Sequence, residues 1–410
     1  MHPITGFATS SLTAHLNSEN SSFQFYKHEP NLDLYLSSIG IGTFKGAISP
    51  PEQEDLIESI VLAVNGGINV IDTAARYRHG ISELNIGEAI SRLSLHDSHV
   101  REKLFISSKA GLICNPYPNS SVNDYIQSEL IPCTGLSDKC FYDNTFCLEP
   151  LFLEHQLQLS LARMNLTTLD CFYLHNPETV FLYNNISDSY SLLRQAFFAL
   201  ESFRASGRIR SYGISSWNGF RRDKLSCFRL DIERLLSFAV DAGGMNHGFH
   251  FVQLPISVGM PYVLKHSIPE YLRSLGFSLM SSASAYEGNL SSLETLSKCF
   301  NSYGLSDSPN ETHPAEVSFP KSENSLIQLF DTLNSFRRLG LSLSEFLNTI
   351  CRSDDLYYSA INIVRSLPEV TTALVGMEKS SYAELNLALS TAPLCSPDKM
   401  LKYKMLIRSN

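Results

Sequence analysis

The chain has 410 residues, of which 43% are hydrophobic and 18% are charged, and its formal net charge is −9. A chain of this length and apolar content can bury a large core, and α/β barrels of this size are often single domains. The acidic balance argues against a nucleic-acid-binding surface, which is usually basic, and the absence of an apolar run of about 18 residues argues against a membrane span.

The N-terminal segment has no apolar stretch typical of a secretory signal. We expect residues 1–30 to form a poorly ordered tail and the protein to be cytoplasmic, with a mitochondrial address as the alternative because this segment contains no arginine and few acidic residues. None of the nine cysteines belongs to a C-x-x-C pair, so a metal site is not indicated.

Short apolar runs alternate with amphipathic stretches along the rest of the chain. The predicted strands are Ser38–Gly42, Asn69–Asp72, Leu104–Ser108, Cys171–Leu174, Ile209–Ile214, Phe251–Leu254, Phe277–Met280 and Thr371–Val375. The predicted helices are Pro51–Asn65, Ser82–Leu93, Pro150–Arg163, Leu192–Ala205, Leu230–Ala242, Ile268–Leu275, a longer block over Ser322–Leu367, and Ser381–Leu389.

This alternation is the pattern of an α/β protein with a (β/α)₈ TIM barrel. Runs such as "INVID" and "CFYL" are nearly continuous in apolar residues, as expected for strands buried on both faces. A doubly wound sheet is the alternative, but "GIGTFKG" at Gly40–Gly46 has one residue too many for the dinucleotide fingerprint. We therefore predict one barrel domain over residues 31–410.

Two long polar segments interrupt the alternation, at about residues 112–149 and 291–324. Each follows a predicted strand and precedes a predicted helix, so each is a βα-loop at the end of the barrel where active sites lie. Loops of this length are usually functional or disordered. They therefore either shape a substrate pocket or form surface insertions.

Four polar residues lie at or just after the ends of three successive predicted strands. Asp72 ends the second strand and Tyr77 follows it, while Lys109 and His175 follow the third and fourth strands. In a barrel these positions converge at one end. Each residue alone has an ordinary structural explanation, but the joint placement indicates a site. The basic residues beside Tyr77 are expected to be solvated: Arg76, Arg78 and His79.

These residue types suit the delivery of a proton to a carbonyl that receives a hydride. Unperturbed tyrosine has a pKa of about 10 and is a poor acid near neutrality. An ammonium about 4 Å from the phenol of Tyr77 would favour its deprotonation by roughly 4 kcal/mol at an effective dielectric constant near 20. Asp72 would keep the buried Lys109 charged, and His175 would orient the carbonyl oxygen.

The chain resembles the aldo-keto reductases. The segments "IGIGTF", "GINVIDTAARY", "RHGISELNIGEAI", "FISSKAG", "LQLSLARMNLTTLDCFYLHNPE", "GRIRSYGISS" and "LVGM" match that family's landmarks in order, from about Leu36 to Ser390. The motifs "LHNPE" and "YGISSWNGFR" and the long insertions are similar to an uncharacterised branch of the family. The resemblance implies a barrel that binds NADP(H) and a catalytic tetrad of Asp72, Tyr77, Lys109 and His175.

The resemblance also assigns residues to the cofactor and the substrate. The cofactor residues are Gly42, Thr43, Ser215, Ser216, Gln253, Ser282, Ser284, Gly288, Gly376, Lys379 and Asn386. Ser282 replaces the usual tyrosine that stacks on the nicotinamide. Lys379 is the only cation near the expected position of the 2′-phosphate, so NADP(H) is favoured and NAD(H) is the alternative. Phe44 and Trp217 are expected to line the substrate pocket.

The leading hypothesis is therefore an NAD(P)H-dependent oxidoreductase that reduces an aldehyde or ketone, or oxidises the corresponding alcohol or sugar. A cofactor-binding scaffold or channel subunit is the alternative, because some aldo-keto reductases serve in that way. A hydrolase with Ser215, His175 and Asp72 as its triad is disfavoured, because Trp217 occupies the place of the second glycine in a G-x-S-x-G motif. The sequence does not indicate the substrate or the oligomeric state.

Overall fold

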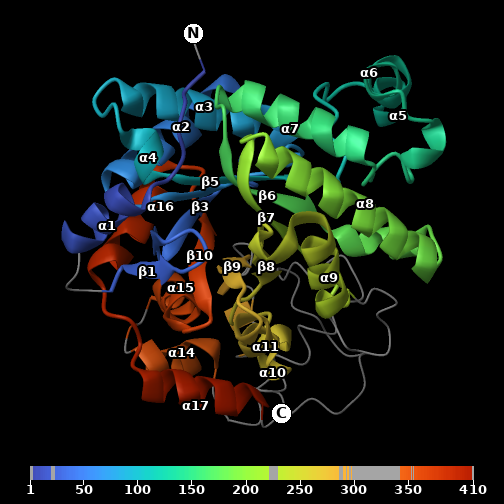
Figure 1. Cartoon of the computed structure of the whole chain (residues 1–410). Helices are drawn as coiled ribbons and strands as arrows, with labels where there is room; N and C mark the ends of the chain where they lie inside the picture. Colours follow the sequence, from blue (N-terminus) through green and yellow to red (C-terminus); the bar gives the residue numbers. More distant parts are fainter. Residues whose placement is uncertain are drawn as a thin grey trace, which may run out of the picture.

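The computed structural model describes residues 3–408 except 20–23, 221–229, 286–289, 292, 295–296, 298–341, 352 and 354. Parallel strands form a closed barrel in the order β10-β3-β4-β5-β6-β7-β8-β9, with helices around it, so the predicted (β/α)₈ TIM barrel is confirmed (Figure 1). The barrel strands are β3 (Ile39–Gly42), β4 (Val70–Asp72), β5 (Phe105–Ala110), β6 (Leu169–His175), β7 (Ile209–Ser215), β8 (Phe249–Pro255), β9 (Ser278–Ser282) and β10 (Val370–Gly376). Each predicted strand overlaps one of them.

The helices that follow the strands also lie close to their predicted positions. They are α2 (Pro50–Asn65), α3 (Ile81–Ser94), α7 (Pro150–Met164), α8 (Ile186–Ala205), α9 (Ile232–Gly243), α11 (Ile268–Ser274), α15 (Leu356–Ser366) and α16 (Ser380–Leu387). The predicted block over 322–367 contains α14 (Leu343–Cys351) and α15 in its described part. Further helices not predicted separately are α4 (Val100–Lys103), α10 (Tyr262–Lys265) and α17 (Pro397–Arg408).

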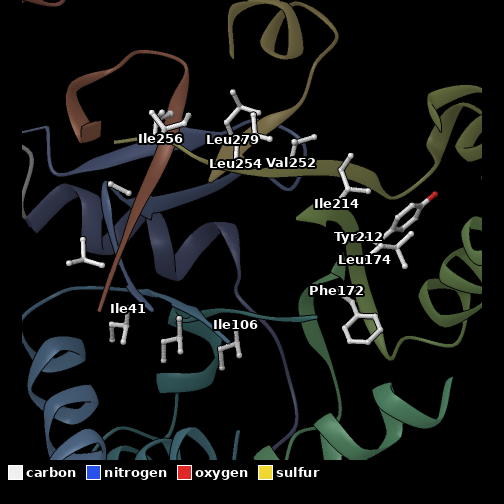
Figure 2. Close-up of a cluster of buried hydrophobic side chains, with 14 of the residues drawn as sticks. Ile41, Ile106, Phe172, Leu174, Tyr212, Ile214, Val252, Leu254, Ile256 and Leu279 are labelled. Atoms are coloured by element: carbon white, nitrogen blue, oxygen red, sulfur yellow. The ribbon is translucent and has the colours of Figure 1, made fainter. Parts of the chain in front are cut away.

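Two apolar layers hold the barrel together. Strand side chains that point outward pack under the helices, and Figure 2 shows several of them: Ile41, Ile106, Phe172, Leu174, Ile214, Val252 and Leu279. Side chains that point inward form a second cluster: Val70, Phe105, Cys171, Tyr173, Phe251, Met280 and Leu374. Gly213 makes room for this interior, since a Cβ there would lie 2.8 Å from the Tyr173 ring. Apolar side chains therefore fill the barrel interior, and the polar side chains of an active site are expected at the rim of the barrel.

The N-terminal segment closes the end of the barrel at which the strands begin. The strands β1 (Tyr26–Glu29) and β2 (Leu34–Ser37) form an antiparallel hairpin, and Leu34 and Leu36 join the interior cluster. Lys27 ties the hairpin to the start of β10 through a 2.5 Å hydrogen bond to the carbonyl of Val370.

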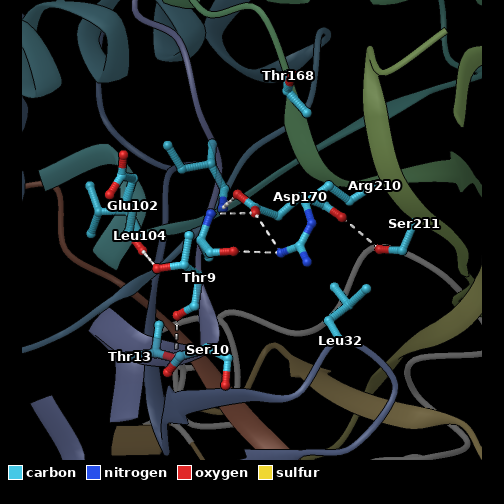
Figure 3. Close-up of polar contacts among 12 residues, drawn as sticks. Thr9, Ser10, Thr13, Leu32, Glu102, Leu104, Thr168, Asp170, Arg210 and Ser211 are labelled. Atoms are coloured by element: carbon cyan, nitrogen blue, oxygen red, sulfur yellow. Dashed lines mark hydrogen bonds and ion pairs between the residues drawn. The ribbon is translucent and has the colours of Figure 1, made fainter. Parts of the chain in front are cut away.

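The prediction of a poorly ordered tail over residues 1–30 is therefore wrong for the described residues 3–19 and 24–30. Residues 10–19 form α1 (Ser10–Glu19), and Ala8 is fully buried in the interior cluster. The backbone N–H of Ala8 donates to Asp170 Oδ1 at 2.9 Å, and Arg210 donates to the carbonyl of Ala8 at 2.6 Å. Figure 3 shows Asp170 with Arg210 and Ser211 next to it. A buried carboxylate and an apolar residue at the barrel end fix this segment.

The long segment between β5 and α7 is folded onto the barrel. It contains the short helices α5 (Val122–Tyr125), η3 (Ile126–Leu130), α6 (Ile131–Thr134) and η4 (Asp138–Cys140). Ile126, Leu130 and Phe146 are fully buried, so this insertion has apolar anchors of its own. Most of the second predicted insertion, about 291–324, lies outside the described residues.

Candidate active site

The four predicted catalytic residues meet at the carboxyl end of the barrel. Lys109, on β5, places its ammonium 2.5 Å from Asp72 Oδ2 and 3.3 Å from the hydroxyl of Tyr77. The same ammonium donates to the carbonyl of Thr73 at 2.8 Å. The His175 ring lies edge-on to the Tyr77 ring, with 5.9 Å between centroids. The spatial grouping predicted from the strand ends therefore exists.

A sharp turn after β4 positions Tyr77. Arg78 and His79 have left-handed backbones, with φ of 51° and 59°, and Gly80 follows with φ of 85°. Such conformations are strained for residues with a Cβ. Hydrogen bonds hold the turn, because Arg78 donates from Nε to the carbonyl of Ala47 at 2.9 Å and His79 Nδ1 lies 2.9 Å from the carbonyl oxygen of Asn115.

The expectation that Arg78 is solvated is therefore wrong. Its side chain is buried, and Nη1 donates to Asn85 Oδ1 at 3.0 Å. The guanidinium thus lies between the segment after β3, which contains Ala47, and α3, which contains Asn85. Arg76 is exposed, as expected, and lines the cavity described below.

Electrostatics keep the Lys109 side chain charged. Burial lowers the pKa of this ammonium, but attraction to Asp72 and then to Tyr77 outweighs burial, so the pKa lies above its ordinary value. A buried charge persists only when it is paired and hydrogen-bonded. The ammonium therefore stabilises negative charge on the phenol oxygen if Tyr77 gives up its proton.

His175 is neutral at ordinary pH. Burial first, and then the positive charges of Lys109 and Arg76, hold the pKa of the imidazole well below its usual range. The ring lines the cavity, and within the described part of the chain its nitrogens make no hydrogen bond to protein, so that its packing against Tyr77 is the contact that holds it. A neutral imidazole can therefore offer an N–H to a ligand oxygen.

A hydrogen-bonded chain across the barrel was not predicted from the sequence. Gln253 Nε2 donates to Asp72 Oδ1 at 3.0 Å, and Gln253 Oε1 accepts from Ser215 Oγ at 2.8 Å. Ser107 Oγ donates to the same Asp72 oxygen at 2.8 Å. Ser107 precedes Lys109 by two positions, so the alternation of a strand places both on one face. That spacing is the signal that could have identified it.

A cavity of about 860 Å³ opens over these residues. Most of the predicted cofactor and substrate residues line it: Gly42, Thr43, Phe44, Ser215, Trp217, Gln253, Ser282, Ser284, Gly376 and Asn386. Ser216 and Lys379 do not line it, and Gly288 lies outside the described residues. Ser216 instead accepts a 2.9 Å hydrogen bond from the N–H of Gly219.

The cavity extends beyond the tetrad to α15 and α16. Its far wall contains Asp355, Tyr357, Glu378, Tyr382 and Asn386. Apolar and aromatic walls with a few polar groups are typical of sites for organic ligands. The volume is of the size expected for such sites, so the residues present fit an extended dinucleotide with one end at the tetrad.

A buried carboxylate shapes the wall next to His175. Glu178 Oε1 accepts hydrogen bonds from the backbone N–H groups of Trp217, at 3.1 Å, and Asn218, at 2.9 Å. Burial raises the pKa of Glu178. The motif "LHNPE" therefore joins the end of β6 to the loop after β7 and holds Trp217 at the cavity. This role of Glu178 was not predicted from the sequence.

Within the described residues there is neither a cluster of metal-ligating side chains nor a helix suited to span a membrane. No group of three or more His, Cys, Asp or Glu side chains there is arranged to hold a metal ion. Among the helices of these residues, none combines the length and apolar character needed to span a bilayer.

Comparisons with known sequences agree with the geometry. Residues 38–231 match the model of the aldo/keto reductase family. The chain is 25% identical over 206 residues to the NADH-specific methylglyoxal reductase of Escherichia coli (strain K12), covering 49% of this chain and 55% of that protein. It is 29% identical over 188 residues to the D-threo-aldose 1-dehydrogenase of Pseudomonas sp, covering 45% and 49%. The chain thus spans about half the length of these curated relatives.

Solved structures show the same fold over most of the chain. The glycerol dehydrogenase of Gluconobacter oxydans superposes with a TM-score of 0.60 at 17% identity, covering 93% of this chain and 94% of that one. An aldo/keto reductase of Klebsiella pneumoniae in complex with NADP and acetate superposes with a TM-score of 0.52 at 16% identity, covering 92% and 93%. At sequence identities this low, the structural similarity shows a shared barrel fold and no more.

Proposed function

We propose that the chain is an oxidoreductase of the aldo-keto reductase type that interconverts an aldehyde or ketone and the corresponding alcohol or sugar, a proposal supported by the match of residues 38–231 to the aldo/keto reductase family model. One observation carries the proposal: Lys109 contacts both Asp72 and Tyr77 beneath a cavity that His175 also lines. This arrangement provides a proton donor, a charge that stabilises the donor's anion, and a neutral hydrogen-bond donor for the substrate oxygen.

Each of the four tetrad residues has its own role in the proposed reaction. Tyr77 donates its proton to the carbonyl oxygen of the substrate, and Lys109, 3.3 Å from the phenol oxygen, stabilises the resulting charge. Asp72 holds Lys109 in its charged form. His175 donates a hydrogen bond that orients and polarises the carbonyl oxygen. A nicotinamide dinucleotide, when bound, supplies the hydride or accepts it in the reverse direction.

The cofactor is proposed to lie along the cavity, with its nicotinamide held near Ser215 and Gln253. Both side chains line the cavity close to the tetrad, and both offer amide or hydroxyl groups to a carboxamide. NADP occurs in the complex of the Klebsiella pneumoniae relative, and the Escherichia coli relative is named as NADH-specific. These names support a nicotinamide dinucleotide, either NADP(H) or NAD(H).

The substrate is proposed to enter between Phe44 and Trp217. Phe44 is 60% exposed and packs edge-on against Tyr77, with 5.1 Å between ring centroids. Leu112, at the start of the long segment after β5, also lines the cavity. The expectation that this insertion shapes the substrate pocket is kept as part of the proposal.

The test is turnover of a panel of aldehydes, ketones, alcohols and sugars with each dinucleotide, followed at the nicotinamide absorbance band. Tyr77→Phe removes the proton donor while keeping the ring, so turnover should fall by at least about a hundredfold, with little change in dinucleotide affinity. Tyr271→Phe, at an exposed position on α11 outside the cavity lining, is the matched control. Dinucleotide binding without turnover on any member of the panel would favour a cofactor-binding scaffold instead.

A further inference from the structure

The far end of the cavity has a charge pattern that the expected NADP(H) site would not have. Asp355 and Glu378 both line this end. Glu378 follows β10, and a Cβ added to Gly376 would lie 3.2 Å from its Oε2. Asp355 begins α15, where its Oδ1 accepts the N–H of Tyr358 at 2.8 Å. The two carboxylates therefore come from the start of α15 and from the segment that follows β10.

The cation expected here does not contribute to the wall. Lys379 was predicted to hold a 2′-phosphate, but its side chain is exposed and is not part of the cavity lining. Ser59 Oγ donates to the backbone carbonyls on either side of Glu378, those of Met377 at 2.7 Å and Lys379 at 3.1 Å, and Glu378 lines the cavity.

The cations that do line the cavity come from the loops near the tetrad. Arg76 precedes Tyr77, and its charge helps to lower the pKa of His175. Lys45 follows Phe44, which packs on Tyr77. From α15, the end of β10 and α16, no described lysine or arginine side chain lines the cavity.

Arg78 lies near Glu378 but is committed elsewhere. A Cβ at Gly46 would be 3.7 Å from Arg78 Cζ and 3.4 Å from Glu378 Cβ, so the two side chains flank the same glycine. The guanidinium donates to the carbonyl of Ala47 and to Asn85, and it does not line the cavity. Its charge and that of Glu378 attract each other, but only Glu378 of the two lines the cavity and can contact a ligand there.

The apolar groups at this end suit an adenine ring. Tyr357, Tyr382 and Leu385 line the cavity and keep 37%, 40% and 65% of their surfaces exposed. Since the proposed function places the nicotinamide at the tetrad, the opposite end of the same cavity receives the adenosine. Exposed aromatic surfaces bordered by carboxylates match an adenine with a ribose diol.

We propose that Glu378 and Asp355 make this protein select NAD(H) over NADP(H). The inference rests on the proposed function, because it requires a nicotinamide dinucleotide in the cavity. A carboxylate accepts hydrogen bonds from a ribose 2′-hydroxyl, whereas a 2′-phosphate needs lysine or arginine partners. A phosphate monoester carries close to two negative charges at neutral pH, and two carboxylates repel it.

The experiment measures dissociation constants of NADH and NADPH for the full-length protein by isothermal titration calorimetry, without substrate. We expect NADPH to bind at least about tenfold more weakly than NADH, a difference of about 1.4 kcal/mol. Raising the ionic strength should narrow this ratio, because salt screens repulsion between exposed charges. Equal affinities, or tighter binding of NADPH, would overturn the inference.

Substitutions assign the effect to its residues. Glu378→Gln should lower the ratio of the two dissociation constants by at least about threefold, chiefly through tighter NADPH binding. When Asp355→Asn is added to Glu378→Gln, the ratio of the two dissociation constants should fall further. The asparagine side chain is still able to cap α15. Glu384→Gln is the matched control, since Glu384 is exposed on α16 and does not line the cavity. An unchanged ratio in Glu378→Gln would also overturn the inference.

The outcomes separate this inference from the function beneath it. Preference for NADPH contradicts the selectivity but leaves the oxidoreductase proposal standing. Failure of the natural protein to bind either dinucleotide contradicts both. Circular dichroism of each variant shows whether the fold is retained, and the salt dependence of the natural protein tests the repulsion without any substitution.

Discussion

Gln253 donates a hydrogen bond of 3.0 Å to Asp72 across the barrel. Gln253 lies near the end of β8 and Asp72 ends β4, and these strands are separated by three strands on either side of the closed sheet. Gln253 also accepts from Ser215. The proposed nicotinamide-binding residues are therefore linked directly to the carboxylate that holds Lys109.

We predict that Gln253→Met destabilises the protein as well as weakening dinucleotide binding. The substitution keeps the volume but leaves the hydroxyl of Ser215 and one oxygen of Asp72 with fewer partners, and unsatisfied buried groups cost about 1–3 kcal/mol. Urea denaturation of the protein alone measures the loss in the free energy of unfolding. Gln127→Met, at an exposed position, should change it little, and equal stability of the two variants would contradict the prediction.

Removing one member of the Lys109–Asp72 pair should cost more than removing both. Lys109→Met leaves a buried carboxylate without its counter-ion, which costs about 3–5 kcal/mol. Lys109→Met combined with Asp72→Asn avoids that isolated charge, so the double variant should be more stable than Lys109→Met alone. A double-mutant cycle in urea measures the coupling, and additive losses would show that the two groups act independently.

Acidification should destabilise the protein partly through His175. The folded-state pKa of His175 lies well below its usual value because of burial and the charges of Lys109 and Arg76. Below a pH of about 6.5 the unfolded chain takes up a proton that the folded chain does not, so this residue lowers stability by up to about 1.4 kcal/mol per pH unit.

The measurement is the difference in unfolding free energy between pH 7 and pH 5. His175→Asn should show a smaller loss than the natural protein over this range, while His96→Asn, at an exposed site, should keep the full loss. His250, whose pKa burial lowers to about 4, contributes its own share in all three proteins. Identical pH dependence in the natural protein and His175→Asn would refute the assignment.

The N-terminal segment should be required for stability. Ala8 is fully buried at the end of the barrel interior, and its N–H donates to Asp170, which also pairs with Arg101 at 2.9 Å. Ala8→Asp introduces a carboxylate beside Asp170 and should lower the unfolding free energy by more than about 2 kcal/mol. Thermal unfolding followed by circular dichroism checks this, with the exposed Ala388→Asp as the control.

Much of the fold and the tetrad could be predicted because the signals are local. Continuous apolar runs indicated the barrel strands, and parallel strands bring their carboxyl ends to one rim. Asp72, Lys109 and His175 each lie at or near such an end, so their convergence followed from topology. No knowledge of side-chain packing was needed.

Partners distant in the sequence could not be predicted in the same way. Ala8 reaches Asp170, and Gln253 reaches Asp72, only because the barrel closes. Residues 1–30 were therefore predicted to form a tail, although the buried carboxylate of Asp170 accepts a hydrogen bond from the backbone of Ala8.

The sequence by itself determined that this chain forms a (β/α)₈ barrel with a tyrosine, a lysine, an aspartate and a histidine at its rim. Strand periodicity and the order of the residues are sufficient for that. The tertiary structure decided which neighbouring side chain lines the cavity, placing Glu378 in the wall and leaving Lys379 outside it. The side chains of adjacent residues point in different directions, which backbone dihedrals and packing determine. The charge that a bound ligand contacts depends on which of these side chains points into the cavity.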